Sequence, residues 1–408
     1  GIRRTTGQHP GGIIVLPVGE DINSFTPVQH PANDTTTDIV TTHFDYHSID
    51  SNLLKLDILG HDDPTMIRML EDITNLPAQS IPLDNQDVMS LFKNTEALGI
   101  TPEDIGGCKL GCLGVPEFGT DFAMQMLIDT KPQYFSDLVR IAGLSHGTDV
   151  WLGNAQTLIE EGKATISTAI CTRDDIMIYL IGKGLESELS FTIMESVRKG
   201  KGLKPDWEAE MVAHDVPDWY IWSCKKIKYM FPKAHAAAYV MMAFRIAYYK
   251  IFYPLAYYAA FFSIRASAFS YELMCMGKER LEHYIADYKK RSDTLTKKEQ
   301  DTLKDMRIVQ EMYARGYEFT KIDLYTAQAH RFQIVDGKLM PALDSIEGLG
   351  DKAADAVVLA ARDGKLLSKD DFRQRTKVSK TVIDFMDDLG IFGDIPESNQ
   401  FSLFDFEW

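Results

Sequence analysis

The first 60 residues alternate short apolar runs with polar turns. Apolar stretches near residues 12–17, 38–46 and 52–59 each have the length of a strand. Runs of this length bounded by Gly, Pro, Asn and Asp are typical of strands, whose side chains point alternately to opposite faces. The pattern therefore predicts a strand-rich N-terminal region.

Helical periodicity dominates the remainder of the chain. Apolar residues recur every three to four positions from about residue 86 to 290, which predicts an almost entirely helical block. A charged, connecting helical stretch is expected over 290–325, and a small hairpin over 332–341 around Asp336-Gly337. Residues 342–395 again show helical spacing. Together these patterns predict an α+β chain with a large, mainly helical middle.

Two charged residues interrupt the apolar run at 52–59, which reads as a buried strand. Lys55 and Asp57 are two positions apart, so they leave a strand on the same face. Burial of either charge without a partner would cost roughly several kcal/mol. Two interpretations remain open: the pair neutralises itself, or it serves an external ligand.

The segment upstream of the first predicted strand favours the external ligand. Residues 3–12 read Arg-Arg-Thr-Thr-Gly-Gln-His-Pro-Gly-Gly. Cations, hydroxyls and paired glycines allow a backbone to approach a phosphate closely, with Arg4, His9, Gly11 and Gly12 as candidate contacts. Combined with the charged pair, this segment predicts half of a nucleotidyl-transfer site.

Composition and charge narrow the class of protein. The 408 residues carry a net charge of −16, which argues against a protein that coats nucleic acid nonspecifically but leaves room for an enzyme with one basic cleft. A chain of this length is expected to form roughly two to four domains. Five irregularly spaced cysteines favour a reducing, cytoplasmic setting. The most apolar stretch, 241–262, is interrupted by Arg245, Lys250 and Pro254, so no membrane span is expected.

Two clusters invite a metal interpretation. Cys108 and Cys112 are four positions apart, but no second Cys or His pair lies at zinc-ribbon spacing, which favours free thiols. His43, Asp45 and His47 alternate and would share one face of a strand. A hydrogen-bonded sheet face is the favoured interpretation there, with metal binding as the alternative.

Cations concentrate at two places in the helical block. Residues 196–202, Ser-Val-Arg-Lys-Gly-Lys-Gly, end one predicted helix, and another begins within residues 225–239. Lys233 sits at that start, and His235 and Tyr239 are four positions apart on one helical face. A helix N-terminus with such side chains suits a polyphosphate. The alternative is a solvated basic face on a buried helix.

A Gly-rich turn at residues 143–151 precedes another predicted helix. Ser145, His146 and Asp149 suggest a catalytic group by residue type, but nothing like a nucleophile elbow surrounds them. Helix capping by Thr148 or Asp149 is the favoured interpretation.

These segments together resemble one family. Over essentially its whole length the chain is similar to the C-terminal part of the PolC-type DNA polymerase III alpha subunit, the bacterial C-family replicative DNA polymerase. Because it starts within a motif and has no initial Met, it is expected to be a fragment. The motifs that carry the resemblance are residues 9–12, 54–60, 143–151, 173–175, 195–202 and 231–239.

The resemblance implies an order of domains. Residues 1–85 would be the end of the palm, 86–290 the fingers, 291–395 a duplex-binding domain and 396–408 a clamp-binding tail. The implied fold class is α+β: a strand-rich palm remnant, a large, mainly helical fingers domain and a helix-hairpin-helix domain. The implied partners are primer-template DNA, deoxynucleoside triphosphates, the sliding clamp (beta subunit) and other replisome subunits.

The resemblance also assigns a role to the charged pair. Asp57 matches the third metal-binding aspartate of the palm, and Lys55 matches a neighbour near the nucleotide phosphates. The other two aspartates belong to a Pro-Asp-x-Asp motif that this chain lacks. Two Mg²⁺ ions need all of these carboxylates to activate the primer hydroxyl and stabilise the leaving pyrophosphate. The isolated chain is therefore expected to be inactive.

Cations of the fingers are expected to gather around the incoming triphosphate, where they offset charge on the phosphates. Tyr239 is expected near the base or sugar. The predicted nucleotide-binding residues are Arg4, His9, Gly11, Gly12, Arg173, Arg198, Lys201, Lys233, His235 and Tyr239.

A helix-hairpin-helix is predicted within residues 342–365. The Gly-Leu-Gly hairpin would expose backbone amides to a phosphate, and Ala354 would let the helices pack tightly. Gly348, Gly350 and Lys352 are the predicted DNA contacts. An ordinary helical hairpin is the alternative.

The last residues contain a second short motif. Gln400-Phe401-Ser402-Leu403-Phe404 resembles the bacterial clamp-binding pentapeptide, in which Leu is usual at the second position. Gln400 would bond at the rim of a pocket, and Leu403 and Phe404 would fill apolar subsites, with Ser402 between them.

A portion of a replicative polymerase is the favoured function. The alternatives are a helix-hairpin-helix DNA repair enzyme, such as a glycosylase, and a non-catalytic DNA-binding fragment. A glycosylase would place its catalytic Asp shortly beyond the hairpin and would not need the Lys55–Asp57 strand. The large helical block favours the polymerase.

Overall fold

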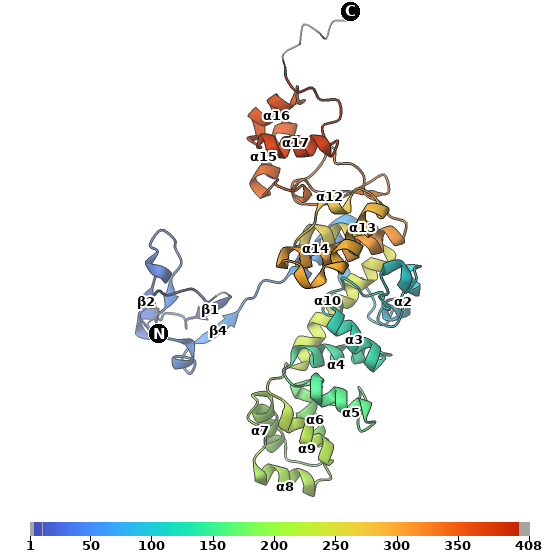
Figure 1. Ribbon diagram of the computed structural model, residues 1–408. Helices are drawn as coiled ribbons and strands as arrows, with labels where there is room; N and C mark the ends of the chain where they lie inside the picture. Colours follow the sequence, from blue (N-terminus) through green and yellow to red (C-terminus); the bar gives the residue numbers. More distant parts are fainter. Residues whose placement is uncertain (1–3, 10, 400–408) are drawn as a thin grey trace, which may run out of the picture. The chain divides into compact units, whose positions relative to one another are not determined.

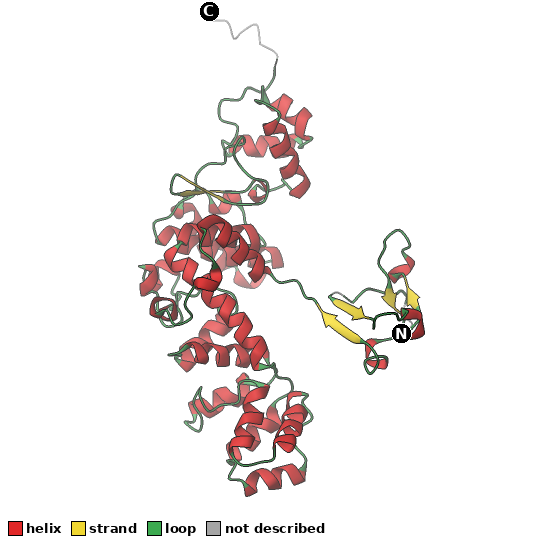
Figure 2. Ribbon diagram, turned by 180° about the vertical axis from the view of Figure 1, so that it is seen from behind, coloured by secondary structure: helices red, strands yellow, loops and turns green. Residues whose placement is uncertain are grey.

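The computed structural model describes residues 4–9 and 11–399. It divides into two compact units, Gly1–Asp62 and Asp63–Trp408. The first contains short strands, and the second is almost entirely helical (Figures 1 and 2). The predicted α+β class is confirmed. The predicted domain boundaries at residues 85, 290 and 395 remain predictions.

Two antiparallel ribbons make up the first unit. Its four strands are β1 (Gly12–Val15) paired with β4 (Leu54–Asp57), and β2 (Val28–Gln29) paired with β3 (Thr41–Thr42). Strands at 12–17 and 52–59 are thus confirmed, whereas the region 38–46 holds only two strand residues.

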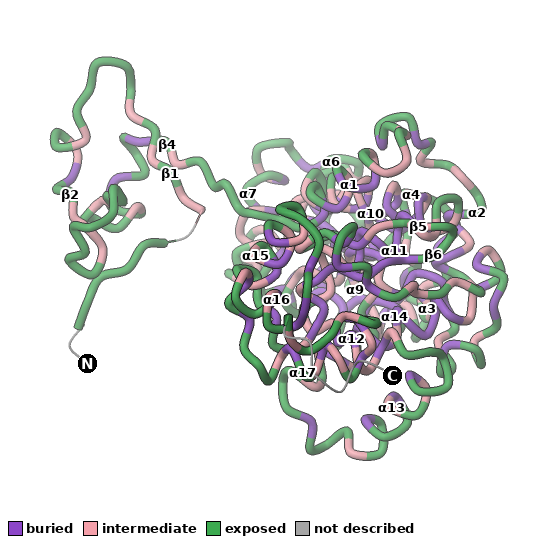
Figure 3. The backbone as a smooth tube through the Cα atoms, turned by 90° about the horizontal axis from the view of Figure 1, so that it is seen from above, coloured by how far each residue is buried: buried purple, intermediate pink, exposed green. Residues whose placement is uncertain are grey.

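The strand that carries Lys55 is not buried, and the prediction of a buried strand was wrong. In the β1–β4 register, Ile13, Val15, Leu54 and Leu56 share one face. All four are exposed, from 37% for Val15 to 61% for Leu54. A two-stranded ribbon has no second layer to cover its apolar side, so alternation alone does not bury it. Figure 3 shows that buried residues are instead concentrated in the helical unit.

The second unit confirms the helical block predicted at 86–290. Short 3₁₀ and π turns join its longer helices. The helices are α1 (Asp62–Thr74), α2 (Gln86–Ser90), α3 (Asp121–Thr130), α4 (Phe135–His146), α5 (Gln156–Glu160), α6 (Arg173–Gly182), α7 (Ser187–Arg198), α8 (Pro205–Ala213), α9 (Asp218–Lys226), α10 (Lys233–Phe252), α11 (Pro254–Ala260), α12 (Tyr271–Met274), α13 (Lys278–Lys290) and α14 (Lys297–Ala314). None of the helices in the described ranges is long and apolar enough to cross a membrane.

Helix α10 lies at the centre of the helical unit and packs against α2, α4, α6 and α11. It begins at Lys233 directly after Pro232, as predicted from the sequence, because proline is pre-organised for a helix start but cannot continue one. Pro254 ends it for the same reason. Val240, Phe244 and Ala247 are fully buried along its inner face.

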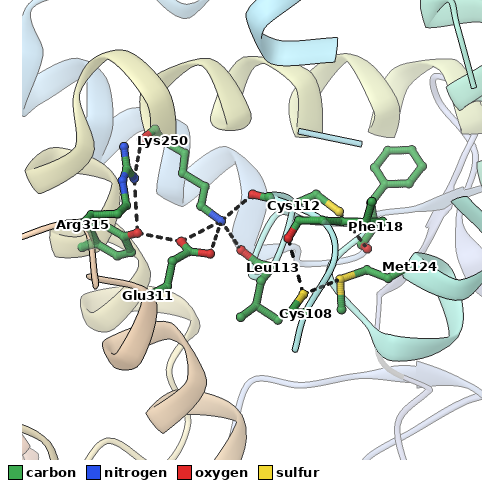
Figure 4. Close-up of polar contacts among 11 residues, drawn as sticks. Cys108, Cys112, Leu113, Phe118, Met124, Lys250, Glu311 and Arg315 are labelled. Carbon is green, nitrogen blue, oxygen red and sulfur yellow. Dashed lines mark hydrogen bonds and ion pairs between the residues drawn. The ribbon is translucent and has the colours of Figure 1, made fainter. Parts of the chain in front are cut away.

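A buried charge network ties one loop to α10 and α14 (Figure 4). The Nζ atom of Lys250 donates to the carbonyls of Gly111 at 2.8 Å and Leu113 at 2.6 Å. It also lies 2.9 Å from Oε1 of Glu311, which accepts a 2.6 Å bond from the hydroxyl of Tyr258. Lys250 and Glu311 are both fully buried, and such burial is tolerated only when each charge is paired and hydrogen-bonded.

None of the five cysteines forms a disulfide. The Sγ atom of Cys108 lies 3.8 Å from the sulfur of Met124, whereas Cys112 points to the carbonyl of Phe118 (Figure 4). Burial raises the pKa of Cys112 to about 12, so this thiol stays protonated and inert.

The C-terminal helices have a hydrophobic cluster of their own. It includes Leu343, Leu349, Ala354 and Phe372, and Ala354 is fully buried, as expected for close helix packing. The hairpin predicted at 332–341 is confirmed. The elements of this region are β5 (Gln333–Val335), β6 (Lys338–Met340), α15 (Asp351–Arg362), α16 (Lys369–Thr376) and α17 (Lys380–Asp388).

Candidate functional site

An exposed ion pair lies on β4 of the first unit. The Nζ atom of Lys55 is 3.2 Å from Oδ1 of Asp57, with side-chain exposures of 26% and 56%. Lys55 also lies over the ring of Tyr46, 4.8 Å from its centroid. The two charges share a face and neutralise each other, yet both remain accessible to a ligand, so the structure does not force a choice between the two interpretations.

The Gly-rich segment lies beside this pair. A Cβ on Gly12 would be 3.5 Å from Cδ of Lys55 and 3.7 Å from Cδ2 of His9, so these three residues are neighbours. Gly11 has a φ of +88°, and a Cβ there would lie 2.9 Å from the carbonyl oxygen of Ile58. Gly11 is therefore required by both conformation and close approach. Arg4 is exposed, and no described contact brings it to the pair.

The three residues His43, Asp45 and His47 do not form the predicted strand face. β3 ends at Thr42, and Asp45 instead caps a 3₁₀ turn through the backbone N–H of His47. The Nδ1 atom of His43 lies 2.9 Å from Oε1 of Gln29. Hydrogen bonds thus engage the side chains of His43 and Asp45.

In the helical unit, several predicted motifs converge on the segment before α10. The N–H of Arg173, at the start of α6, donates to the carbonyl of Phe231 at 3.2 Å. The N–H of Met230 donates to the carbonyl of Arg198, at the end of α7, at 3.3 Å. The ends of α6, α7 and α10 are thus held together through backbone bonds.

Thr148 belongs to the same assembly and does not cap a helix. Its N–H donates to the carbonyl of Tyr229 at 2.9 Å, and its carbonyl accepts from Lys228 at 3.1 Å. Asp149 has a φ of +55°, and the next helical turn begins after Val150 without a side-chain cap. The capping prediction was wrong, because Val150 is the N-cap of the next helical turn, and Thr148 lies outside that turn with its backbone bonded to Lys228 and Tyr229.

The predicted nucleotide-binding cations differ in whether a carboxylate pairs with their side chains. Within the described ranges, no carboxylate forms an ion pair with Arg173, Lys201 or Lys233. By contrast, Nε and Nη2 of Arg198 bind the carboxylate of Glu195 at 2.6 and 2.8 Å. That hydrogen bonding lowers the pKa of Glu195 to about 2. Arg198 is therefore largely neutralised, whereas the other three retain their charge for a ligand.

The first turn of α10 presents a run of aromatic rings. The rings of His235 and Tyr239 lie 4.4 Å apart, which confirms that they share a face. The ring of Phe231 is 5.1 Å from that of His235. Oδ2 of Asp174 accepts the N–H of Lys233 at 2.6 Å, so a carboxylate fixes the start of the helix.

Sequence reasoning missed two residues behind these rings. His146 and Glu117 form a 2.8 Å ion pair, and the His146 ring lies 5.6 Å from Phe231 and 6.0 Å from His235. His146 lay within a noted motif, but its catalytic interpretation was set aside. Glu117 gave no signal, because only the fold brings it to His146.

The predicted duplex-binding hairpin has one strained and one relaxed glycine. Gly348 has a φ of +84°, and a Cβ there would lie 2.9 Å from Cγ2 of Val382. Gly350 is the N-cap of α15 with a φ of −72°, and a Cβ there would meet open space. Lys352 is exposed on the first turn of α15. The fold itself therefore requires glycine at position 348 but would accept a side chain at position 350.

His330 fastens this hairpin to the preceding loop. Its Nδ1 lies 3.0 Å from Oδ2 of Asp344, and its Nε2 lies 2.9 Å from Oδ1 of Asp355 on α15. Hydrogen bonding to Asp344 is the main cause that raises the pKa of His330.

The predicted clamp-binding residues Gln400, Ser402, Leu403 and Phe404 lie outside the described residues.

Comparisons with known proteins agree with this arrangement. Residues 1–60 match a model described as the bacterial DNA polymerase III alpha NTPase domain, and residues 63–215 match the bacterial DNA polymerase III alpha subunit finger domain. Residues 316–400 match a helix-hairpin-helix motif. Curated proteins named DNA polymerase III PolC-type are similar over 99% of this chain: those of Caldanaerobacter subterraneus subsp. tengcongensis and Bacillus subtilis (strain 168) are each 55% identical. The chain belongs to the PolC-type DNA polymerase III family.

The PolC-type relatives are much longer than this chain. The match covers 29% of the Caldanaerobacter protein and 28% of the Bacillus protein. The finger-domain match includes the motifs at 143–151, 173–175 and 195–202. Membership of the PolC-type family disfavours the repair-enzyme alternative, because the helix-hairpin-helix accompanies polymerase domains rather than standing alone.

Proposed function

We propose that this PolC-type segment takes part in template-directed addition of deoxynucleotides to a primer 3′ end. The observation that carries the proposal is the exposed Lys55–Asp57 pair, which lies beside Gly11 and Gly12 in a region matching the polymerase III alpha family. An accessible carboxylate next to a cation and a closely approachable backbone suits a phosphate-bearing substrate.

The carboxylate of Asp57 also suits a divalent cation. Carboxylate oxygens are the ligands that Mg²⁺ prefers, and Asp57 is 56% exposed. In the described part of the chain, no group of metal-compatible side chains includes Asp57. Asp57 would therefore be one ligand among carboxylates supplied from outside this segment. Bound Mg²⁺ would lower the pKa of the primer hydroxyl and neutralise charge on the phosphates.

The helical unit would supply the cradle for the triphosphate. Arg173 and Lys233 begin α6 and α10, and Lys201 follows the end of α7; backbone bonds join these helix ends. None of the three side chains forms an ion pair with a carboxylate among the described residues. His235 and Tyr239 extend the same face of α10. Cations fixed on rigid helix ends offset phosphate charge without reorganising during the reaction.

The test of the chemistry is Asp57→Asn in the full-length polymerase, assayed by single-nucleotide primer extension. We expect the rate to fall by a factor on the order of 10³ or more, because a metal-binding carboxylate is lost. Primer-template affinity, measured by fluorescence anisotropy, should stay within about twofold. Asp38→Asn is the control, since Asp38 is an exposed aspartate elsewhere in the same unit. Incorporation by Asp57→Asn within about tenfold of the Asp38→Asn rate would contradict the proposal.

The test of the cradle compares Lys233→Ala with Arg198→Ala. The side chain of Lys233 forms no ion pair with a carboxylate among the described residues, whereas the side chain of Arg198 is paired with Glu195. We expect Lys233→Ala to raise the KM for the nucleotide by roughly tenfold and Arg198→Ala to raise it less. The reverse order in steady-state kinetics would remove this cradle from the proposal.

We also propose primer-template DNA, the sliding clamp and other replisome subunits as partners, and the cytoplasm as location. The helix-hairpin-helix match supports DNA binding, and five free cysteines suit a reducing compartment. For the clamp, Leu403→Ala with Phe404→Ala should reduce capture on an immobilised clamp by at least tenfold, because two apolar side chains no longer fill their subsites. Equal capture of wild type and double variant would exclude this contact.

A further inference from the structure

The last residue of α4 is held as a cation behind the first turn of α10. Nε2 of His146 lies 2.8 Å from Oε2 of Glu117, and Nδ1 lies 2.6 Å from the carbonyl oxygen of Ala142. Both partners are acceptors, and His146 can donate to both of them together only when both ring nitrogens carry hydrogen, an arrangement that favours the imidazolium form. The C-terminal end of a helix further favours a positive charge. Hydrogen bonding to Glu117 raises the pKa of His146 accordingly.

Glu117 is held in place by a tight turn. The N–H of Gly119 donates to the carbonyl of Val115 at 2.9 Å, and Glu117 adopts a φ of +70°. A non-glycine residue in this conformation is strained and persists only where its surroundings fix it. The Glu117 side chain is only 9% exposed at its contact with His146. The carboxylate is therefore set before any ligand arrives.

The imidazolium is packed against the residues of the proposed cradle. The His146 ring meets Phe231 edge-to-face at 5.6 Å and 72°, and His235 at 6.0 Å and 71°. Phe231 and His235 contact each other at 5.1 Å. These contacts connect the Glu117 turn, the end of α4 and the start of α10 in one chain of side chains.

We propose that His146, held by Glu117, is a positioning residue that sets the orientation of Phe231 and His235 for an incoming nucleoside triphosphate. This role rests on the proposed nucleotidyl transfer and deepens it. Because Glu117 balances the charge of His146, the contribution of His146 is a rigid surface for the His235 ring. It does not replace the side chains that meet the phosphates.

A nucleophilic Ser-His-Glu triad is a different use of the same atoms, and the geometry excludes it. Oγ of Ser145 lies 3.0 Å from Nδ1 of His146, but that nitrogen already donates to Ala142. Ser145 itself donates to the same carbonyl at 2.9 Å. Nδ1 therefore has no lone pair to receive the serine proton.

The test uses His146→Gln and Glu117→Gln in the full-length polymerase, with His214→Gln as control. His214 also combines a backbone bond, 2.9 Å to the carbonyl of Glu210, with a carboxylate neighbour, but it follows α8 away from the cradle. For both cradle variants we expect the KM for the nucleotide to rise on the order of tenfold, with primer-template affinity within twofold. His214→Gln should leave both measurements at wild-type values.

A double-variant cycle separates positioning from general stability. If His146 acts through His235, then His146→Gln should have little further effect on KM in a His235→Ala background. Independent effects would overturn the positioning role, as would a rise in KM that is accompanied by parallel losses of primer-template affinity and unfolding temperature. An unchanged KM in both His146→Gln and Glu117→Gln, with active wild-type enzyme, would also overturn it. Survival of activity in the Asp57→Asn variant would instead refute the proposed function. Failure of the positioning role and failure of the proposed function are therefore distinguishable.

Discussion

Removing one partner of the buried Lys250–Glu311 pair is the sharpest test of how the helical unit is held together. Lys250→Met deletes the ammonium that binds two backbone carbonyls and Glu311, and leaves the Glu311 carboxylate in a fully buried site. Breaking such a pair by removing one charge costs about 3–5 kcal/mol. Burial already lowers the pKa of Lys250, which shows that the site tolerates the charge only because Glu311 opposes that effect.

The assay is unfolding followed by calorimetry and by guanidinium titration. With an unfolding entropy of roughly 2 cal/mol/K per residue, a loss of 4 kcal/mol lowers the midpoint of a unit this large by about 5 °C. Lys297→Met is the control, because its 2.9 Å ion pair with Asp301 leaves Lys297 77% exposed, and such pairs contribute at most about 1 kcal/mol.

Lys250→Met combined with Glu311→Leu should recover most of the loss, because well-packed apolar side chains replace a buried ion pair at little cost. If Lys250→Met were no less stable than Lys297→Met, the network would not anchor the loop and the reasoning would be refuted. The same loop continues into the turn that carries Glu117, so nucleotide affinity should weaken together with stability.

Three further outcomes follow from the described contacts. Burial raises the pKa of Asp305 to about 7, above the unfolded value of about 3.9, so the stability that protonated Asp305 contributes is lost as pH rises through 7. Asp305→Asn should therefore raise the unfolding midpoint, measured by calorimetry, at pH 8 but not at pH 4. The pKa of His330 is raised chiefly by hydrogen bonding to Asp344, so the contribution of His330 to folding stability is fully present below about pH 6.5 and is lost as pH rises through its folded-state pKa. The stability difference between wild type and His330→Gln should therefore shrink from pH 6 to 9. Gly348→Val should lower both stability and duplex affinity, whereas Gly350→Ala should lower duplex affinity alone at constant salt; unchanged affinity in both variants would return the hairpin to a purely structural role.

Local sequence rules predicted the elements whose signals are themselves local. The start of α10 after Pro232 and the two-residue turn at Asp336-Gly337 needed only proline geometry and left-handed turn residues. The shared face of His235 and Tyr239 followed from helical spacing. Motif resemblance then supplied the family.

The failures have a different physical origin. Burial of β4 was inferred from its apolar alternation, but burial depends on a second layer that strand pairing alone does not provide. Capping by Thr148 failed because the next helical turn begins only after Val150, and the backbone of Thr148 pairs instead with Tyr229, far along the chain. Glu117 could not be predicted for the same reason. Its contact with His146 arises from the tertiary structure, and the sequence separation of the two residues does not indicate it.

The open apolar face of the β1–β4 ribbon has a practical consequence for work with this chain. Ile13, Val15, Leu54 and Leu56 form an exposed apolar patch on a ribbon of only two strands, and we expect copies to associate through such a surface at high concentration. Solubility should therefore improve when Leu54 and Leu56 are replaced by Thr, which keeps strand propensity while removing the apolar patch. Light scattering of both forms during concentration gives a direct readout, and crystallisation trials would gain from the less adhesive form.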